Sequence, residues 1–282
     1  MKIGLIANKE KPHAAEVCAQ IAARLLSGGA SVCANLSLPG AAFCDGGEQV
    51  IRTCDIAVTV GGDGTIIHNA KHAAFYDRPL LGVNLGRVGF VANIEPSELD
   101  ELSGLLDGSY QIQERMLLDI TIEKDGEIHR YTAVNEAALH RDSLSSMVDI
   151  SVSLDGERII TYRADGMLFS TPTGSTAYSF SAGGPVLQPD LACILLTPVC
   201  PHALSSRQVV FGADAVLTAE VMPGSDQKCY MTVDGQNYVA ISSDDRITVR
   251  RSDRKLKLII LKEKNFYTLL NEKLKEPSSY ED

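Results

Sequence analysis

Hydrophobic positions in the first third of the chain follow two alternating periodicities. Apolar, β-branched runs predict buried strands, whereas apolar residues at helical spacing predict two helices. Gly28-Gly29 predicts the end of the first helix, and Ser97 predicts the N-cap of a third, over 97–107. Strands that alternate with helices in this way predict a parallel sheet with crossover helices. The expected strands are 2–7, 30–36, 55–60 and 78–84, and the two helices are 13–27 and 65–76.

The pattern changes near residues 109–117, after which polar and apolar positions alternate. Three such runs are interrupted by Asp125-Gly126, Asp155-Gly156 and Asp234-Gly235, which are strong two-residue hairpin signals. We therefore predict an α/β N-terminal domain with a parallel sheet, followed by a β-rich C-terminal domain. The expected boundaries are 1–112 for the first domain, 113–270 for the second and 271–282 for a flexible tail.

Composition narrows the class of protein. The 282 residues are 45% hydrophobic and 22% charged, which is typical of a globular protein and excludes a disordered one. The net charge of −10 argues against a nucleic-acid partner, which would favour a basic face. The apolar stretch "LACILLTPVCP" is too short to span a membrane and contains prolines, so we expect no membrane partner.

Two further features bear on the cellular compartment. The start, "MKIGLIANKEKP", has a short apolar run before charge returns, which favours a strand over a signal peptide. Seven scattered cysteines form no C-x-x-C pair, which favours a reducing compartment over a disulfide framework. We therefore expect a cytoplasmic protein.

The stretch "VGGDGTIIH", residues 60–68, places an acid inside a glycine loop between a predicted strand and a predicted helix. Such a loop attracts phosphate, because the helix N-terminus carries a partial positive charge. The Asp63 carboxylate would repel a phosphate unless a divalent cation or a substrate hydroxyl lay between them. Both are phosphoryl-transfer roles. The alternative is that Asp63 merely caps the helix.

A second glycine-containing stretch, "STPTGSTAYSFSAGGP" at residues 170–185, follows the strand "GMLFS" and is rich in hydroxyl groups. Its hydroxyls and turn N–H groups suit a base edge or a diphosphate, because they add no charge. The alternative is an ordinary exposed Ser/Thr-rich loop, which would not need Tyr178 and Phe180. A short helix is predicted to begin near Ser175.

These two stretches together resemble NAD kinase, the enzyme that makes NADP from NAD and a nucleoside triphosphate. The stretch 82–92 ("GVNLGRVGFVA"), Asn135-Glu136, 163–166 ("RADG") and 232–235 also fit this family. The resemblance implies a two-domain NAD kinase-like fold and a catalytic Asp63 that activates the adenosine 2′-hydroxyl of NAD. It also implies a substrate- and nucleotide-binding set: Gly62, Gly64, Thr65, Phe90, Asn135, Glu136, Arg163, Asp165, Thr173, Thr176, Ala177, Tyr178, Ser181 and Arg207.

Within that set the expected roles differ. Asn135 and Glu136 are placed on the second strand of a hairpin, with Asn135 toward the ribose and Glu136 near phosphate or metal. The stretch from Thr173 to Tyr178 is expected to hold adenosine, and Phe90 to form a wall beside the adenine. Asp165 is expected to contact nicotinamide, in many family members from a neighbouring subunit.

The resemblance also implies NAD and ATP as ligands, Mg²⁺ arriving with ATP, and self-association to a dimer or tetramer. No protein residue is assigned as a metal ligand. Two alternatives stay open: a non-catalytic NAD(P)-binding sensor, and a lipid or sugar kinase that shares the GGDGT loop. The sequence leaves open NAD against NADH, ATP against polyphosphate, and feedback by NADP or NADPH.

Overall fold

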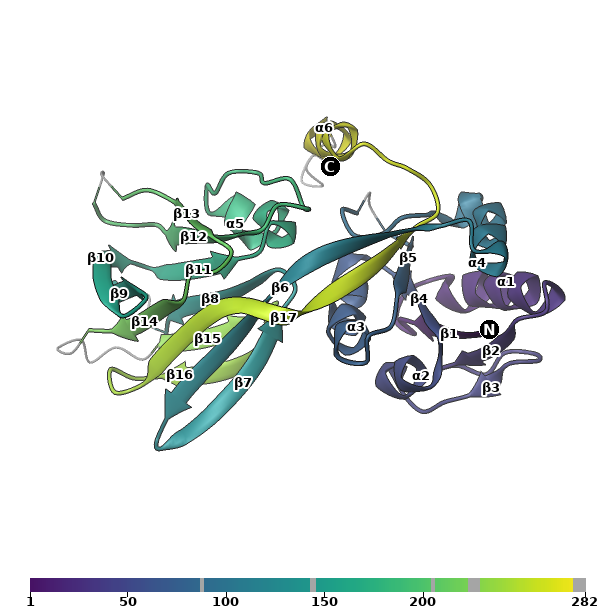
Figure 1. Ribbon diagram of the computed structural model, residues 1–282, viewed down its shortest axis with the longest axis horizontal. Coiled ribbons are helices and arrows are strands. Elements are labelled where there is room, and N and C mark those ends of the chain that lie inside the picture. The colour runs from purple at the N-terminus through teal and green to yellow at the C-terminus, as the bar shows by residue number, and fades with distance from the viewer. Residues whose placement is uncertain (87–88, 143–145, 204–205, 223–228, 276–282) are drawn as a thin grey trace. The chain divides into compact units, whose positions relative to one another are not determined.

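The chain divides into two compact units, Met1–Glu114 with Leu256–Asp282, and Arg115–Lys255. The computed structural model describes residues 1–86, 89–142, 146–203, 206–222 and 229–275 (Figure 1). The division that we expect after residue 112 stays a prediction, and the first unit also includes the segment from residue 256 onward.

The first unit is built on a parallel sheet with the strand order β5-β4-β1-β2-β3. Ala7 at the end of β1 pairs with Val60, and Gly61 at the end of β4 pairs with Asn84. The carboxyl ends of β1, β4 and β5 therefore meet at one edge of the sheet. The strands are β1 (Lys2–Ala7), β2 (Ser31–Ala34), β3 (Ala42–Phe43), β4 (Ile56–Gly61) and β5 (Leu80–Asn84).

Helices cover both faces of this sheet (Figure 1). Ile3 and Leu5 of β1 belong to the buried core shared with Ile21 of α1. Gly4, which points the other way, lies so close to α2 that a Cβ would come within 2.6 Å of Val50. Burial on both faces explains why the strands are apolar without alternation. The helices are α1 (Ala14–Ser27), α2 (Gly47–Thr53), α3 (Asp63–Phe75), the 3₁₀ helix η1 (Pro96–Leu102) and α4 (Ser103–Asp107).

The expected strands and the first two helices are confirmed, with two differences. Helix α3 begins at Asp63, two residues before the expected start, so the acid belongs to the first turn. Ser97 as an N-cap is wrong, because Glu95 caps η1 and forms a capping box with Glu98. Pro96 occupies the first helical position, which fixes the start one residue before Ser97.

The second unit contains two sheets that share one hydrophobic core. One sheet has the order β10-β9-β14-β17 and also includes β6 and β7, and the other has the order β13-β12-β11-β8-β15-β16. Its helical elements are η2 (Thr173–Thr176) and α5 (Tyr178–Ser181). The strands are β6 (Gln111–Lys124), β7 (Glu127–Ala133), β8 (Glu136–Arg141), β9 (Val148–Leu154), β10 (Glu157–Ala164), β11 (Gly166–Ser170), β12 (Cys193–Val199), β13 (Val209–Gly212), β14 (Leu217–Val221), β15 (Cys229–Val233), β16 (Gln236–Ile241) and β17 (Arg246–Ile260).

The three Asp-Gly hairpins are confirmed. They connect β6 to β7, β9 to β10 and β15 to β16, and both turn residues have positive φ in each. The helix that we expect from Ser175 is the single 3₁₀ turn of η2 followed by the short α5.

Asn135 and Glu136 do not lie on the second strand of a hairpin, which corrects our prediction. The second strand, β7, ends at Ala133, and Glu136 begins β8 in the other sheet. No glycine or proline marks the junction from Ala133 to Glu136, so the sequence pattern hides the change of sheet.

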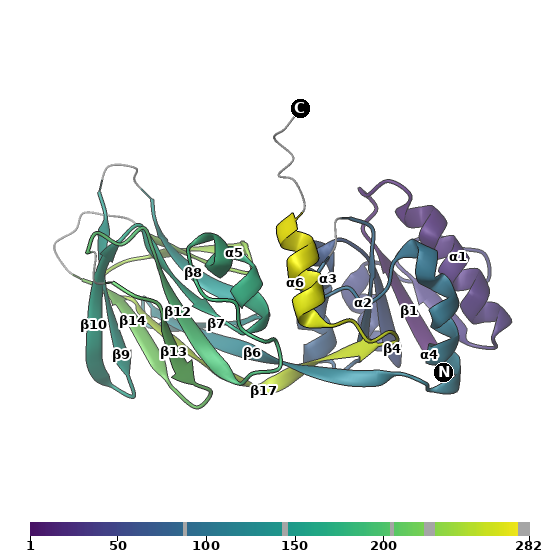
Figure 2. The ribbon, with the colours of Figure 1, turned by 90° about the horizontal axis from the view of Figure 1, so that it is seen from above.

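The end of the described chain returns to the first unit. In β17, Leu258 pairs in parallel with Leu80 of β5, and Ile259 joins the core of that unit. Helix α6 (Phe266–Lys275) follows, where part of the flexible tail was expected, and it is the yellow helix of Figure 2. Residues 276–282 of the expected tail lie outside the described residues. Among the helices of the described part, none has the length and apolar character that crossing a membrane requires.

Candidate functional site

The glycine loop lies at the sheet edge where β4 ends. Gly62 is the N-cap of α3 with an extended backbone, and its carbonyl accepts hydrogen bonds from Thr65 and Ile66. A Cβ added at Gly62 or Gly64 would meet no atom within 4 Å. The backbone at this helix N-terminus is therefore open to a ligand, and the geometry suits an anion.

Asp63 does not cap α3, because no side-chain cap hydrogen bond is formed there. Its Oδ2 instead accepts a hydrogen bond from the Phe90 backbone N–H at 3.0 Å, and Lys273 Nζ lies 3.7 Å from the same oxygen. The other oxygen, Oδ1, is buried and has no hydrogen-bond partner in the described structure. The carboxylate is thus fixed through one oxygen and keeps acceptor capacity on the other.

Gly89 is a residue of this site that our reading of the sequence did not single out. A Cβ at Gly89 would lie 2.1 Å from Asp63 Oδ1, which is far inside contact distance. Only a glycine therefore lets this backbone pass the carboxylate. The contact joins a loop to a helix that lies far from it in the sequence, so no local pattern announces it.

A hollow of about 910 Å³ opens beside the glycine loop, within the first unit. Residues that follow β1 and residues of α3 line it, including Asn8, whose Nδ2 donates to Thr65 Oγ1 at 3.2 Å. Two carboxylates and two histidines also line it. These are Asp45, Glu48, His68 and His72.

The two histidines of this hollow contact each other, with ring centroids 5.7 Å apart. Burial lowers the pKa of His72 below its ordinary value, although the nearby Glu48 carboxylate opposes this shift. His72 is therefore largely neutral near pH 7.

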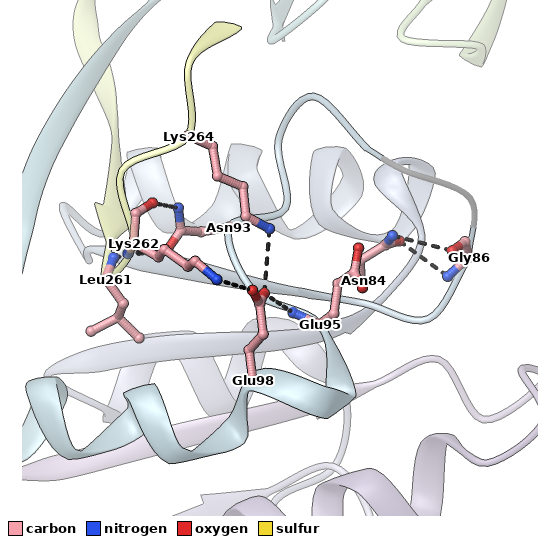
Figure 3. A network of polar contacts seen from close by, with 8 residues as sticks. All are labelled: Asn84, Gly86, Asn93, Glu95, Glu98, Leu261, Lys262 and Lys264. Carbon is pink, nitrogen blue, oxygen red and sulfur yellow. Dashed lines mark hydrogen bonds and ion pairs between the residues drawn. The ribbon is translucent and has the colours of Figure 1, made fainter. Parts of the chain in front are cut away.

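A smaller hollow of about 310 Å³ lies between the 84–95 segment and α6, also within the first unit. The chain that leads to α6 is anchored beside it (Figure 3). Asn93 Oδ1 accepts hydrogen bonds from the backbone N–H groups of Leu261 and Lys262, and its Nδ2 donates to the Lys262 carbonyl. Glu98 pairs with Lys262 at 2.5 Å and with Lys264 at 3.3 Å.

The charge balance at Glu98 supports this anchor. Burial opposes ionisation of its carboxyl, but hydrogen bonds from Lys262 and the Glu95 N–H, with the Lys264 charge, outweigh burial and lower its pKa. Glu98 is therefore ionised at neutral pH and holds both lysines.

In the second unit, the Asp234 carboxylate organises the segment that precedes β8. Its Oδ1 accepts hydrogen bonds from the N–H groups of Asn135 at 2.7 Å and Glu136 at 3.0 Å, and its Oδ2 accepts one from Val134 at 3.0 Å. Three consecutive backbone donors are satisfied by one side chain. Sequence reasoning found Asp234 only as a turn residue and missed this clamp.

The 171–178 stretch packs directly on this clamped segment. Thr171 Oγ1 donates to the Val134 carbonyl at 2.6 Å, and the Thr171 N–H donates to the Asn135 carbonyl at 2.8 Å. A Cβ at Gly174 would lie 2.1 Å from the Asn135 carbonyl oxygen. Asn135 and the 171–174 turn are therefore brought together, as we expect from the sequence.

The remaining residues of the stretch present groups of different kinds. Thr173 is 6% exposed, and its Oγ1 has no hydrogen-bond partner in the described structure. Thr176 and Ala177 are half-buried, whereas Ser181 is exposed. Tyr178 is 37% exposed and stacks on His140, with ring centroids 5.6 Å apart. The stretch thus combines buried hydroxyls with an aromatic surface, which an ordinary loop would not need.

Three further expected residues lie at the edge of this unit. Asp165 forms an ion pair with Arg141 at 2.8 Å. Arg163 and Arg207 are exposed. The hydroxyl of Tyr162, next to Arg163, donates to the Arg207 carbonyl at 2.9 Å, which places the two arginines on adjoining segments.

A parallel sheet with a glycine loop, an acid at the N-terminus of a helix and a second β-rich unit defines a class of phosphotransferase. Two family models match the chain: the ATP-NAD kinase N-terminal domain over residues 3–110 and the ATP-NAD kinase C-terminal domain over residues 134–261. The chain belongs to the NAD kinase family.

Individual relatives agree with this assignment. The chain is 41% identical over 225 residues to an NAD kinase of Natranaerobius thermophilus, with 79% of this chain and 78% of the relative covered. An NAD kinase from Archaeoglobus fulgidus, solved in complex with ATP, has a TM-score of 0.75 at 25% identity, covering 96% of this chain and 98% of its own. Yeast NADH kinase, solved with NADH, shares the fold with a TM-score of 0.86 at 23% identity, covering 99% of this chain and 89% of its own.

Proposed function

We propose that this protein transfers the terminal phosphoryl group of ATP to the adenosine 2′-hydroxyl of NAD, giving NADP. The observation that carries the proposal is the state of the Asp63 carboxylate. A backbone N–H fixes its Oδ2, while Oδ1 has no hydrogen-bond partner in the described structure. An acceptor oxygen held in this way suits a general base for a hydroxyl proton.

The donor is proposed to occupy the hollow at the edge of the first unit's sheet. That hollow lies at the carboxyl ends of β1 and β4, where the strand order reverses. Ligands of open α/β sheets bind at such a point. Gly64 and Thr65 line its phosphate side at the N-terminus of α3. Asp45 and Glu48 would repel phosphate, so the nucleoside is placed toward them.

The chemical step follows from these positions. The 2′-hydroxyl gives its proton to Asp63 as its oxygen attacks the terminal phosphorus, and the bond between that phosphorus and the bridging oxygen breaks. ADP leaves with the electron pair of that bond. The phosphoryl group passes from oxygen to oxygen, so no covalent enzyme intermediate is required. The chain's contribution is to hold the reacting groups in line.

Each unit offers groups that suit the acceptor. Phe90 offers a ring beside Asp63, and the stretch from Thr173 to Tyr178 offers hydroxyls and an aromatic surface. Asn135 is proposed to contact the ribose. Arg163 and Arg207 are proposed to lie toward the diphosphate, and Asp165, with Ser181 nearby, toward nicotinamide.

A divalent cation is implied by an ATP-dependent kinase family, and we propose Mg²⁺. The carboxylate of Glu136 is a hard oxygen donor of the kind that Mg²⁺ accepts beside nucleotide phosphates. When bound, the cation would neutralise charge on the triphosphate.

Self-association and a cytoplasmic location are also proposed. If Asp165 serves a neighbour's site, the protein works as a dimer or tetramer, which sedimentation would establish. A cytoplasmic location is supported by the seven free thiols. Burial raises the pKa of Cys18 and Cys54 to about 12. These two thiols therefore stay protonated and unreactive.

The alternatives are not favoured. A lipid or sugar kinase has no use for the clamped Asn135-Glu136 segment or for the Thr171–Tyr178 stretch. A pure sensor gains nothing from an acid at a phosphate-binding helix terminus.

The test is a coupled assay in which a dehydrogenase specific for NADP reports product formed from NAD, ATP and Mg²⁺. NADP formation that requires both ATP and NAD is expected. Binding of NAD without formation of NADP would contradict the kinase and favour the sensor.

A further inference from the structure

We propose that helix α6 is an autoinhibitory latch, in which Lys273 occupies the place of the acceptor and thereby weakens the apparent affinity for NAD. This inference rests on the proposed function, because it uses the same Asp63 and Phe90. It adds a residue that determines acceptor affinity and lies outside the glycine loop and the hydroxyl-rich stretch.

A single ammonium group covers both acceptor-facing groups of the first unit. Lys273 Nζ lies 3.7 Å from Asp63 Oδ2 and 4.5 Å from the centroid of the Phe90 ring. The ring of Phe266, also on α6, lies 5.9 Å from that of Phe90. An adenosine that stacks on Phe90 and presents its 2′-hydroxyl to Asp63 needs the space that Lys273 fills. Acceptor and α6 therefore compete for the same surface.

Helix α6 is built to be displaced rather than to support the fold. None of its residues is buried, and the side chains of Lys273 and Asp63 are each 30% exposed. Contacts of partly exposed charges and rings are weak enough to break at modest cost. The helix nevertheless has its own cap, because Asn265 Oδ1 accepts hydrogen bonds from the N–H groups of Tyr267 and Thr268.

The chain before α6 is held firmly, which confines the motion to the helix. Asn93 and Glu98 fix residues 261–264 through the hydrogen bonds and ion pairs drawn in Figure 3. The small hollow of about 310 Å³ lies directly after this anchor, with Asn265, Thr268 and Leu269 in its wall. Because residues 261–264 are anchored and a hollow lies beside α6, the helix can move away while the sheet keeps its structure.

The latch also accounts for the surroundings of the Asp63 carboxylate. Asp63 Oδ1 is buried next to Gly89, and the Lys273 ammonium lies over the Phe90 ring, 4.5 Å from its centroid. The Phe90 N–H donates to the Asp63 carboxylate, and Gly89 lies next to that carboxylate. When Lys273 leaves, the Phe90 ring is uncovered. Acceptor binding is therefore coupled to departure of α6.

The test compares Lys273→Ala with Lys275→Ala by calorimetric titration of NAD and by steady-state kinetics. Lys275 is exposed, lies on the same helix and carries the same charge, so it is a matched control. Loss of one ion pair and one cation–π contact predicts NAD binding about three- to tenfold tighter in Lys273→Ala, with Lys275→Ala unchanged. The KM for ATP should not move, because no α6 residue lines the larger hollow.

A second measurement follows the helix itself. Backbone amide exchange of residues 265–275 in the wild type is expected to become faster when NAD is added, because α6 loses its contacts with Asp63 and Phe90. Slower or unchanged exchange overturns the latch.

The outcomes separate the two proposals. Tighter NAD binding in Lys273→Ala without any NADP formation would contradict the proposed function but support the latch. Equal or weaker NAD binding, or equal tightening in both variants, overturns the latch whether or not NADP is formed. Failure of the wild type and of every variant to bind NAD would contradict both the proposed function and the latch.

Discussion

At the scale of single residues, the site depends on how closely backbone approaches side chain. Asp63 is held by the Phe90 N–H, while the Gly89 backbone passes its other oxygen. Both of these contacts come from the backbone, whereas the charged group beside the carboxylate, Lys273, lies 3.7 Å from Oδ2. The position of Asp63 is therefore set by the conformation of the 89–90 backbone.

Gly89→Ala should reduce kcat about 100-fold, because a displacement near 1 Å has that effect on a positioned catalytic group. The added Cβ would lie 2.1 Å from Asp63 Oδ1 and must push the carboxylate aside. Steady-state kinetics and thermal unfolding measured together check this prediction. The control is Gly212→Ala, where a Cβ meets no atom within 4 Å. Equal kcat in both variants would show that Gly89 does not position Asp63.

At the scale of elements, three hairpins have the same Asp-Gly turn, but their aspartate side chains make different contacts. Asp125, Asp155 and Asp234 each have φ close to +50° and each precede a glycine. The Asp125 side chain is 84% exposed, whereas that of Asp234 accepts three backbone hydrogen bonds from the 134–136 segment. Asp155 Oδ1 accepts one hydrogen bond, from the Val216 N–H, so the third turn makes the most extensive contact with a neighbouring segment.

Asp234→Ala should lower the free energy of unfolding by about 2–4 kcal/mol, because it leaves buried donors without an acceptor. Asp125→Ala imposes the same positive-φ strain on alanine without that loss, so it should cost at least about 2 kcal/mol less. Urea unfolding of the two variants measures the difference. If the two variants lose equal stability, the clamp contributes nothing beyond turn strain.

The elements also differ in how well the sequence predicts them. Helix α1 and the Asp-Gly hairpins are predictable because their signals lie within a few residues of one another. The change of sheet between Ala133 and Glu136 is not, because the clamp that causes it comes from Asp234, with 99 positions separating it from Asn135. Glu95 as the cap of η1 was missed because Ser97 is the commoner cap residue, while Pro96 fixes the start.

At the scale of the whole molecule, the first unit is not a continuous segment of chain. Residues 256–282 belong to it, with Leu258 beside β5 and Ile259 in its core. A sequence read from one end predicts the first domain up to residue 112 but has no local signal for this return. For the same reason, Lys273 could not be predicted to meet Asp63 from local spacing, whereas Asp63 itself could be chosen from its motif.

Two truncations should separate the returning strand from the helix. A chain that ends after Lys255 loses Leu258, Ile259 and the Asn93 anchor, so its first unit should unfold at lower urea and be cut faster by protease. A chain that ends after Lys264 keeps all of these. Among the described elements it loses α6 alone, which buries no residue, so its free energy of unfolding should fall by less than about 1 kcal/mol.

Urea unfolding and limited proteolysis of both truncated chains would check this pair of outcomes. Equal destabilisation would mean that α6 supports the fold and is not a displaceable element.

The most direct measurement for the central claim is the turnover of Asp63→Asn, made together with its NAD affinity. The amide keeps the size of the side chain and its acceptor for the Phe90 N–H but cannot take a proton. A general-base role predicts a loss in kcat of roughly 10²–10⁴-fold. The dissociation constant for NAD should stay within about threefold of the wild type, since the binding surface is kept. A kcat close to that of the wild type would contradict the assignment of Asp63 as the base.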